Sequence, residues 1–430
     1  MHRLQNLSDL TPSVPTNNSN KKNYHWKNTI KNAGPSPQSP DDIVICGAVR
    51  TALTKAKRGG FKDTKTEELL APLFTALIEE TGLKKDAIQD ICIGNVLQRS
   101  VALCSRVSQY FAGVPSSVPV HTINRQCSSG LQAIAAVAAS IKANYIDIGL
   151  AGGVESMTNY EMSDALSPSD ISTSAYDVEL ARNCLIPMGV VSELFTEKMK
   201  YSRNNLDIIG VHSQKKAAKA NEMGLFKEEI VPVTTMFKDS NGNTKEILVQ
   251  EDDGIRPNTN LKNLEKLKSP FKKGGSSHSG NSSQKSDGAA LCIVARRSKA
   301  EELGLPIIAK FHAFSLVGVA PEQYPEGPAL AIPKVLKETG LTMGDIDIFE
   351  VNEAFASVVH HTIEELKIPQ HKLNPKGGAI AIGHPLGCTG ARQLATLLPE
   401  LRRTKSRYGI VSMCIGTGMG AAAVFENLIL

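Results

Sequence analysis

Residues 90–95, which read DICIGN, have a counterpart in residues 347–352, which read DIFEVN. The tetrapeptide ETGL ends an amphipathic segment shortly before each of them, at Leu83 and at Leu341. The offsets are 352 − 95 = 257 and 341 − 83 = 258 residues, so one residue is lost between the two markers. A match in both the residues and the order of the predicted elements indicates an internal duplication.

Each copy alternates short apolar runs with helical segments. In the first copy, IVICGAV at 43–49 is followed by TEELLAPLFTALIEETG, which stops at Gly82, and DIGLAGG at 147–153 comes later. This alternation predicts parallel βαβ units and an α/β fold made of two duplicated halves. An offset of 257 carries Cys127 onto His384 and Gly130 onto Gly387, each just before a predicted helix.

Four segments follow from this pattern. Residues 1–40 are rich in Asn, Ser and Pro and are predicted to form a flexible leader. Residues 41–160 with 287–300 form the first half, and 301–430 form the second half. Residues 161–286 break the βαβ rhythm and are predicted to be a loop domain inserted in the first half.

Composition narrows the classes of function. With 41% hydrophobic and 21% charged residues and no apolar run of about 18 residues, the chain is predicted to be globular and not embedded in a membrane. Of the net charge of +5, about +4 lies in residues 1–40, so the rest gives no support to nucleic-acid binding. Eight scattered cysteines without a CxxC pair favour reduced thiols in an intracellular protein.

Cys127 heads the apolar segment INRQCSSGLQAIAAVAASI at 123–141, where a predicted strand turns into a helix. A helix N-terminus lowers the pKa of a thiol and favours the nucleophilic thiolate. The structural alternative is an inert buried cysteine, because free cysteine is among the most buried residue types.

The second half supplies possible partners for this thiol. His384 lies in the glycine-dense segment NPKGGAIAIGHPLGCTGAR, and a cysteine paired with such a histidine can be an activated nucleophile. A metal shared by His384 and Cys388 lacks further ligands at suitable spacing. His360 and His361 are adjacent on a helix and point in different directions, so no metal site is predicted.

Two more groups follow predicted strands. Cys414 ends one strand, and the loop with Gly416 after it resembles a dinucleotide fingerprint but precedes a short apolar strand instead of a helix. Its backbone N–H groups are better suited to bind an oxyanion. Asn352 is predicted to open a helix, where its amide could orient a water or serve only as an N-cap.

The predicted insertion carries a basic segment, LKNLEKLKSPFKK at 261–273. Such a run is usually a solvated face, and the second reading is a site for a phosphate-bearing ligand. Its lysines, opposed by Glu265 alone within the run, are Lys262, Lys266, Lys268, Lys272 and Lys273.

The motifs NRQCSSGLQA, GNSSQKSDGAA, NEAFA, GGAIAIGHPLGCTGAR and SMCIGTGMGAAAVFE resemble the thiolase family, most closely its peroxisomal members, over about residues 41–426. The resemblance implies two βαβ halves in a layered α/β/α/β/α arrangement and a homodimer. It also implies cleavage of 3-ketoacyl-CoA by CoA to acetyl-CoA and an acyl-CoA shortened by two carbons. CoA is then a substrate, and no cofactor is expected.

The resemblance also implies residue roles. Cys127 would attack the ketone and carry the acyl group, His384 would form its thiolate and stabilise developing charge, and Cys414 would move protons. One oxyanion hole would combine His384 with a water held by Asn352. The other would use the backbone N–H groups of Cys127 and Gly416. The insertion's lysines would lie near the phosphates of CoA, and the other expected CoA contacts are Met188, Ser283 and Phe355.

Several features depart from the family pattern. His278 and Ser279 stand where the family usually has Thr and Ala. Lys285 stands where an apolar residue is common, and Tyr324 and Pro325 stand where a Met-Gly pair is usual. The leader segment RLQNLSDL resembles an N-terminal peroxisomal signal that an import receptor would read, but it lacks the expected His and one residue. A mitochondrial leader is the alternative location.

Other functions remain open from the sequence. They are a condensing biosynthetic acetoacetyl-CoA thiolase and a non-catalytic acyl-CoA-binding protein with the same fold. A ketosynthase is disfavoured, because Cys414 stands where that class is expected to use a second histidine.

Overall fold

The two copies of the repeat form matching strands of two half-sheets. The computed structural model describes residues 38–165 and 170–429. The first half-sheet has the order β1-β8-β5-β3-β4 (Ile43–Arg50, Ser286–Arg296, Ile148–Ser156, Asp90–Gly94, Val120–Ile123), with β2 (Thr54–Lys55) paired to β8. The second has the order β9-β12-β11-β10 (Ala309–Gly318, Met419–Asn427, Tyr408–Ile415, Ile348–Val351).

The sense of pairing is also duplicated. In the first half β3 is parallel to β4 and β5, and β8 is antiparallel to β5 and β1. In the second half β10 is parallel to β11, and β12 is antiparallel to β11 and β9. An isolated parallel bridge between Phe349 and Leu373 occupies the position in the second half that the pairing of β3 with β4 occupies in the first. The predicted duplication is therefore confirmed, and β1 and β9 join the half-sheets.

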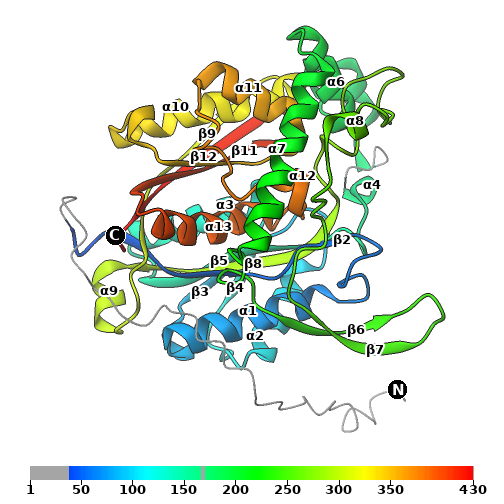
Figure 1. The fold of residues 1–430 in the computed structure, drawn as a ribbon. Coiled ribbons are helices and arrows are strands. Elements are labelled where there is room, and N and C mark those ends of the chain that lie inside the picture. The colour runs from blue at the N-terminus through cyan, green and yellow to red at the C-terminus, as the bar shows by residue number, and fades with distance from the viewer. Residues whose placement is uncertain (1–37, 166–169, 430) are drawn as a thin grey trace.

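Helices cover and separate the half-sheets in five layers (Figure 1). The outer layers contain α1 and α2 (Thr66–Thr81, Val101–Phe111) on one side and α10 and α11 (Gly327–Thr339, Ala356–Leu366) on the other. The central layer contains α3 and α13 (Ser129–Lys142, Thr389–Arg403), which pack on each other. Alanine and glycine on α3 let it fit between two sheets, and most of its residues are buried.

The register of the duplication differs from the predicted one at the central helices. α13 begins 260 residues after α3 (389 − 129), not 257. A Cβ on Gly130 would lie 3.0 Å from the backbone nitrogen of Ala391, and one on Gly390 would lie 2.4 Å from that of Leu131. Gly130 therefore corresponds to Gly390, and not to Gly387 as predicted.

His384 is accordingly not the strict duplicate of Cys127. An offset of 260 carries Cys127 to Gly387, three residues further on. The additional residues of the second half lie between Asn352 and α13, where short helix α12 (Ala379–Ile382) precedes the turn that contains His384. The two groups still precede equivalent helices, so they approach the same central layer from opposite halves.

Between β5 and β8 the chain forms the predicted insertion, which lies along one side of the layers (Figure 1). Its helices and strands are α4, α5, α6, α7, β6, β7 and α8 (Met162–Ala165, Glu179–Asn183, Met188–Lys198, Arg203–Glu222, Val233–Lys238, Thr244–Val249, Leu261–Leu264). Helix α9 (Arg297–Glu302) follows β8. The short 3-10 helices are η1, η3, η4 and η5 (Lys85–Ala87, Thr173–Asp177, Pro321–Glu326, Met343–Asp345).

A buried ion network attaches this insertion to both halves. Glu229 of the insertion accepts hydrogen bonds from Arg50 of the first half at 2.7 Å and from Lys376 of the second at 2.6 Å. Arg50 also donates to both carboxylate oxygens of Asp252, at 2.7 and 2.8 Å. Because an unpaired buried charge is costly, these bonds fix the insertion against the two halves.

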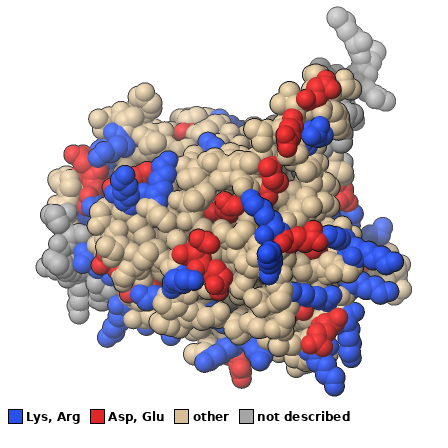
Figure 2. Space-filling view, turned by 90° about the horizontal axis from the view of Figure 1, so that it is seen from above, with Lys and Arg blue, Asp and Glu red and all other residues tan. Residues whose placement is uncertain are grey.

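The surface carries both signs of charge. On the face shown in Figure 2, Lys and Arg side chains are interspersed with Asp and Glu side chains. Within residues 38–165 and 170–429, no helix has both the length and the apolar character needed to cross a bilayer.

Gly153 on β5 is expected to be essential for the approach of the two halves. A Cβ there would lie 1.9 Å from the carbonyl oxygen of Gly387, which belongs to the loop after His384. We expect Gly153→Ala to lower the free energy of unfolding by about 3 kcal/mol, measured by chemical denaturation. Gly318→Ala is the control, because no atom lies within 4 Å of its Cβ position. Equal effects of the two substitutions would contradict this explanation.

Candidate active site

Cys127 lies in a tight turn between β4 and α3. Asn124 accepts a hydrogen bond from the N–H of Gln126 at 2.9 Å, and the hydroxyl of Ser129 donates to the carbonyl of Gln126 at 2.6 Å. Gln126 has a φ of 49°, a strained value for a residue with a side chain. The turn presents Cys127, which is 9% exposed, beside an apolar cluster that includes Leu97, Met157 and Leu386.

Burial dominates the titration of this thiol. It raises the pKa of Cys127 to about 11, although hydrogen bonds to the sulfur from the backbone N–H groups of Gly416 and of Cys127 itself lower it. The sequence predicted a lowered pKa from the helix N-terminus, and desolvation outweighs that effect here. The resting sulfur is therefore a thiol, and a nearby base must remove its proton.

His384 can supply that base. Thr389 donates its hydroxyl proton to the carbonyl of Pro385 at 3.0 Å, so its oxygen accepts from Nδ1–H of His384 at 2.6 Å. This pattern assigns the ring proton to Nδ1 and leaves the lone pair on Nε2. Burial, aided by the charge of Arg392, lowers the pKa of His384 to about 3, so the imidazole is neutral at physiological pH.

Thr389 is expected to set the tautomer of His384. We expect Thr389→Val to reduce kcat by about 100-fold with little change in KM. The Nδ1–H group of His384 then loses the oxygen that accepts its hydrogen bond, and the ring loses much of its function as a general base. Steady-state kinetics measure both constants. Thr362→Val is the matched control, since Thr362 is also buried and donates to a carbonyl four residues earlier. Wild-type kcat in Thr389→Val would contradict the assignment.

Asn352 is brought to His384 from the end of β10. Its Nδ2 lies 3.3 Å from Nε2 of His384, and its backbone N–H donates to the carbonyl of Ser412 at 2.9 Å. Its Oδ1 is buried and accepts no hydrogen bond from the part of the chain that the structure describes. The amide thus faces the same space as the imidazole.

The predicted helix start at Asn352 is wrong, because α11 begins at Ala356. The backbone before it is extended and joins the insertion: Ser283 donates its N–H to the carbonyl of Ala354 at 3.0 Å, and Ser282 forms an antiparallel bridge with Phe355. Asn352 therefore lies in a connecting turn, where the N-cap alternative does not apply.

Cys414, at the end of β11, lies in a second apolar cluster with Met188 and Phe355, two of the predicted CoA contacts. Burial, followed by the charge of Cys127, raises the pKa of Cys414 well above its ordinary value. The two thiols are thus within electrostatic reach of each other. Gly416, which follows the strand, directs its N–H at Cys127.

Tyr324, one of the departures from the family pattern, is fully buried in the same cluster as Cys414. Its hydroxyl donates to the carbonyl of Met188 at 3.0 Å. Burial raises the pKa of Tyr324 well above its ordinary value, with smaller contributions from the charges of Cys414 and Cys127. The sequence marked the position as unusual, but did not place it beside both thiols.

Glu155, at the end of β5, was not singled out from the sequence. Its carboxylate accepts hydrogen bonds from the N–H groups of Val96, Leu97 and Gly387 and from the amide of Asn95, at 2.9–3.1 Å. Burial raises its pKa to about 7, while these bonds lower it. It connects a loop of the first half with the histidine loop of the second. The available signal was one acidic residue in an apolar strand.

His360 and His361 lie outside this site and contact different groups. Nδ1 of His361 lies 3.0 Å from the Tyr201 hydroxyl, whereas Nε2 of His360 lies 3.3 Å from the amide nitrogen of Asn205. Among the described residues, no group of three or more His, Cys, Asp or Glu side chains is arranged to hold a metal ion.

Comparisons with known proteins agree with this architecture. The thiolase N-terminal domain matches residues 43–298, and the thiolase C-terminal domain matches residues 305–427. The peroxisomal 3-ketoacyl-CoA thiolase of Homo sapiens is 52% identical over 92% of this chain and 93% of its own length. The peroxisomal 3-ketoacyl-CoA thiolase 5 of Arabidopsis thaliana is 49% identical over 93% of this chain and 88% of its own length.

Solved structures give the same result. The crystal structure of the dimeric peroxisomal thiolase of Saccharomyces cerevisiae has a TM-score of 0.84 and 44% identity, covering 91% of this chain and 98% of that one. The acetyl-CoA acetyltransferase of Bacillus anthracis has a TM-score of 0.81 and 32% identity, covering 90% and 99%.

The fold and the site define an α/β protein of two duplicated halves that meet over a pair of buried thiols. The domain matches span nearly all of the described chain, and the named relatives are about half identical to it over nine-tenths of its length. The chain belongs to the thiolase family.

Proposed function

We propose that this thiolase cleaves 3-ketoacyl-CoA with CoA to give acetyl-CoA and an acyl-CoA shortened by two carbons, as an acyltransferase. The observation that carries this proposal is that Cys127 and Cys414, one from each half, interact electrostatically, while Leu386, two residues after the neutral His384, packs in the cluster of Cys127. The names of the human and Arabidopsis relatives support the same reaction. No cofactor enters it, because CoA is itself the second substrate.

The first half-reaction forms an acyl-enzyme. Nε2 of His384 takes the proton of Cys127, whose sulfur attacks the ketone carbon of the substrate. The bond between the α and β carbons then breaks, and its electron pair passes to the leaving acetyl-CoA enolate. Cys414 gives its proton to the enolate carbon, which releases acetyl-CoA and leaves the acyl group on Cys127.

The second half-reaction returns the enzyme to its starting state. The Cys414 thiolate takes the proton of the incoming CoA thiol, whose sulfur attacks the acyl carbon. The Cys127 thiolate leaves and recovers its proton from His384. The predicted oxyanion holes would bind the two substrate oxygens, one by His384 with a water on Asn352, the other by the N–H groups of Cys127 and Gly416. The position of these N–H groups at the sulfur supports the second hole.

A two-substrate assay tests this function. The chain is supplied with CoA and 3-ketoacyl-CoA of several lengths, and the products are identified by mass spectrometry. Acetyl-CoA and a product shortened by two carbons are expected. Cleavage of acetoacetyl-CoA alone would instead favour a biosynthetic thiolase, the alternative that the sequence left open. Binding of acyl-CoA without any turnover would favour a non-catalytic protein and overturn the proposal.

A homodimer is part of the proposal. β4 is the last strand of its half-sheet and pairs with β3 on one side only within the described residues. Helix α2, which packs on β4, exposes Leu103, Tyr110 and Phe111, a pattern suited to burial against a second copy. The yeast neighbour is described as dimeric. Sedimentation analysis measures the state directly, and a monomer would overturn this part.

The peroxisome is the proposed location. The named relatives are peroxisomal thiolases, which favours this location over the mitochondrial alternative. The predicted signal RLQNLSDL lies outside the described residues, and an import receptor that reads it remains part of the proposal. Fluorescence microscopy of the full chain with a C-terminal fluorescent tag tests the location. Fluorescence in mitochondria would overturn the proposed location.

A further inference from the structure

A continuous wall leads from the reacting thiols to the basic segment 261–273, hereafter the lysine segment. The Sδ atom of Met188 lies 3.5 Å from the position of a Cβ on Gly416. Phe271 of the lysine segment packs so closely on Gly189 that a Cβ there would lie 2.2 Å from its ring. The rings of Phe271 and Phe355 also meet edge to face, with centroids 5.9 Å apart. A ligand whose thiol lies at Cys127 can therefore reach the lysine segment along this wall.

The lysine segment retains excess positive charge. Its five lysines are exposed, and Lys272 pairs with Glu197. In the described part of the chain no carboxylate forms an ion pair with the other four, which are Lys262, Lys266, Lys268 and Lys273. Unpaired cations at the end of the wall fit a ligand with several phosphates, such as the nucleotide end of CoA.

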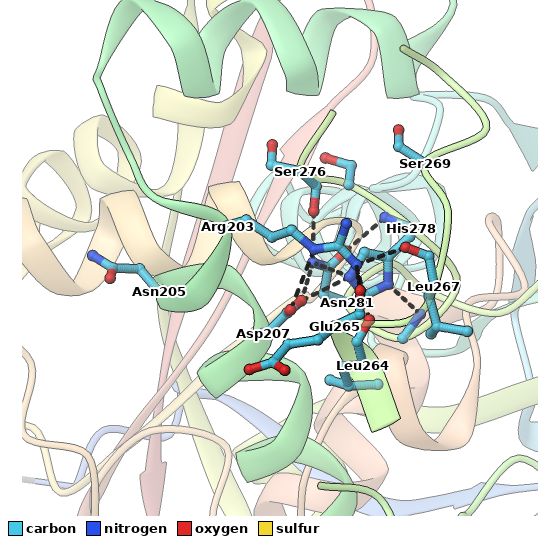
Figure 3. Close-up of polar contacts among 12 residues, drawn as sticks. Arg203, Asn205, Asp207, Leu264, Glu265, Leu267, Ser269, Ser276, His278 and Asn281 are labelled. Atoms are coloured by element: carbon cyan, nitrogen blue, oxygen red, sulfur yellow. Dashed lines mark hydrogen bonds and ion pairs between the residues drawn. The ribbon is translucent and has the colours of Figure 1, made fainter. Parts of the chain in front are cut away.

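Arg203 holds the first part of this segment in shape. The only helix of the segment is the single turn α8, so its backbone carbonyls need other partners. Nη2 of Arg203 donates to the carbonyls of Leu264, Glu265 and Leu267 at 2.8, 3.3 and 2.6 Å (Figure 3). Of these residues, Glu265 and Leu267 flank Lys266, and Leu267 also precedes Lys268.

Asp207 and His278 hold Arg203 in turn. Oδ2 of Asp207 lies 3.5 Å from Nε of Arg203, one turn away on α7. Its Oδ1 accepts hydrogen bonds from Nε2 of His278 and from Nδ2 of Asn281, both at 2.8 Å (Figure 3). The N–H of Gly280 donates to Nδ1 of His278 at 3.1 Å, which assigns the ring proton to Nε2, the atom that faces Asp207.

The same network is attached to the wall. The carbonyl of Asn281 accepts the N–H of Ala356 at 2.9 Å, directly beside Phe355. We propose that Arg203, Asp207 and His278 are positioning residues that hold the lysine segment where it receives the phosphates of CoA. This inference rests on the proposed function for the identity of the ligand. It does not place these residues at the reacting atoms.

A second anchor holds the other end of the lysine segment, and Nδ2 of Asn281, which also donates to the carbonyl of Ser276 at 2.8 Å, connects the network to it. The carboxylate of Glu193 accepts hydrogen bonds from the hydroxyl of Ser269 at 2.9 Å and from the N–H groups of Ser276 and Ser277 at 2.9 and 2.7 Å. Removing Arg203 or His278 should therefore loosen residues 264–268 and leave the second anchor in place.

The test compares two thiols, CoA and pantetheine, which lacks the phosphates and the nucleotide. The variants are His278→Ala and Arg203→Ala, with His371→Ala as the control for loss of a histidine outside this network. Binding is measured without an acyl donor, and kcat/KM is measured with each thiol as acceptor. We expect the preference for CoA over pantetheine to fall about tenfold in each variant, because bonds to charged groups are lost, and to be unchanged in the control.

The double variant sharpens the test. Because both residues act through one network, its loss of preference should be smaller than the product of the two single losses. Equal losses for CoA and pantetheine, or an unchanged preference in Arg203→Ala, would overturn the inference. If the wild-type chain shows no thiolysis, the proposed function is overturned, yet a selective loss of CoA binding in the variants would still support the positioning role.

Discussion

Replacing Cys127 by alanine is expected to reduce thiolysis by about 10⁴-fold, because the acyl group then has no sulfur to which it can transfer. The substitution removes a single sulfur atom, and Cys127 is 9% exposed, so the protein should remain folded. Turnover is measured by acetyl-CoA formation. Transfer of a radiolabelled acyl group to the protein is measured in parallel, and it should disappear in Cys127→Ala.

Another cysteine provides the control. Cys104 lies half-buried in α2, where its sulfur accepts a hydrogen bond from Gln98 at 3.0 Å. Cys104→Ala should change turnover less than twofold, since Cys104 lies outside the clusters that contain Cys127 and Cys414. Retention of a tenth of wild-type turnover in Cys127→Ala, or labelling of that variant, would contradict the nucleophilic role.

Much of this architecture was predictable because it depends on local pattern. The strands at 90–94 and 348–351 are short apolar runs bounded by polar residues, and their equivalence follows from the repeated ETGL and the order of elements. Cys127 follows a strand and Cys414 lies near the end of one, and ligands in open α/β folds bind at the carboxyl ends of strands. These arguments need no knowledge of distant contacts.

The unpredicted features depend on tertiary contacts. The register of the second half shifts by three residues because α12 and the histidine turn fit between the halves, and pattern alone gives no position for such an insertion. The helix start moves from Asn352 to Ala356 because residues 353–355 pair with the insertion. Glu155 joins the loop at 95–97 to Gly387, which lies 232 residues after Glu155 in the chain.

The titration of Cys127 shows the same limit. Its position before a helix indicated a lowered pKa, whereas burial between the two halves raises it. Desolvation depends on everything packed around the sulfur, including the loop of His384 in the other half. The consequence is chemical: a thiol that is protonated at rest needs the neutral imidazole that the Thr389 hydrogen bond prepares.

Replacing Cys414 by alanine is expected to slow thiolysis by about 10³-fold, within the range that general acid–base catalysis contributes. The raised pKa of Cys414 keeps its thiol protonated, as the acid for the enolate carbon must be. A sharper readout is exchange of the methyl hydrogens of acetyl-CoA with deuterium from D₂O, followed by mass spectrometry. Each exchange needs removal and return of a proton at the same carbon, so Cys414→Ala should abolish it.

The two thiols can be separated by this exchange, because it forms no acyl-enzyme. Cys127→Ala keeps the proton-transfer group and should still exchange the methyl hydrogens, although it no longer cleaves 3-ketoacyl-CoA. We expect the burial of Cys414, together with the predicted oxyanion hole of His384 and Asn352, to allow an enolate to form without the nucleophile. Loss of exchange in Cys127→Ala, or its persistence in Cys414→Ala, would reverse the assignment of acid and nucleophile.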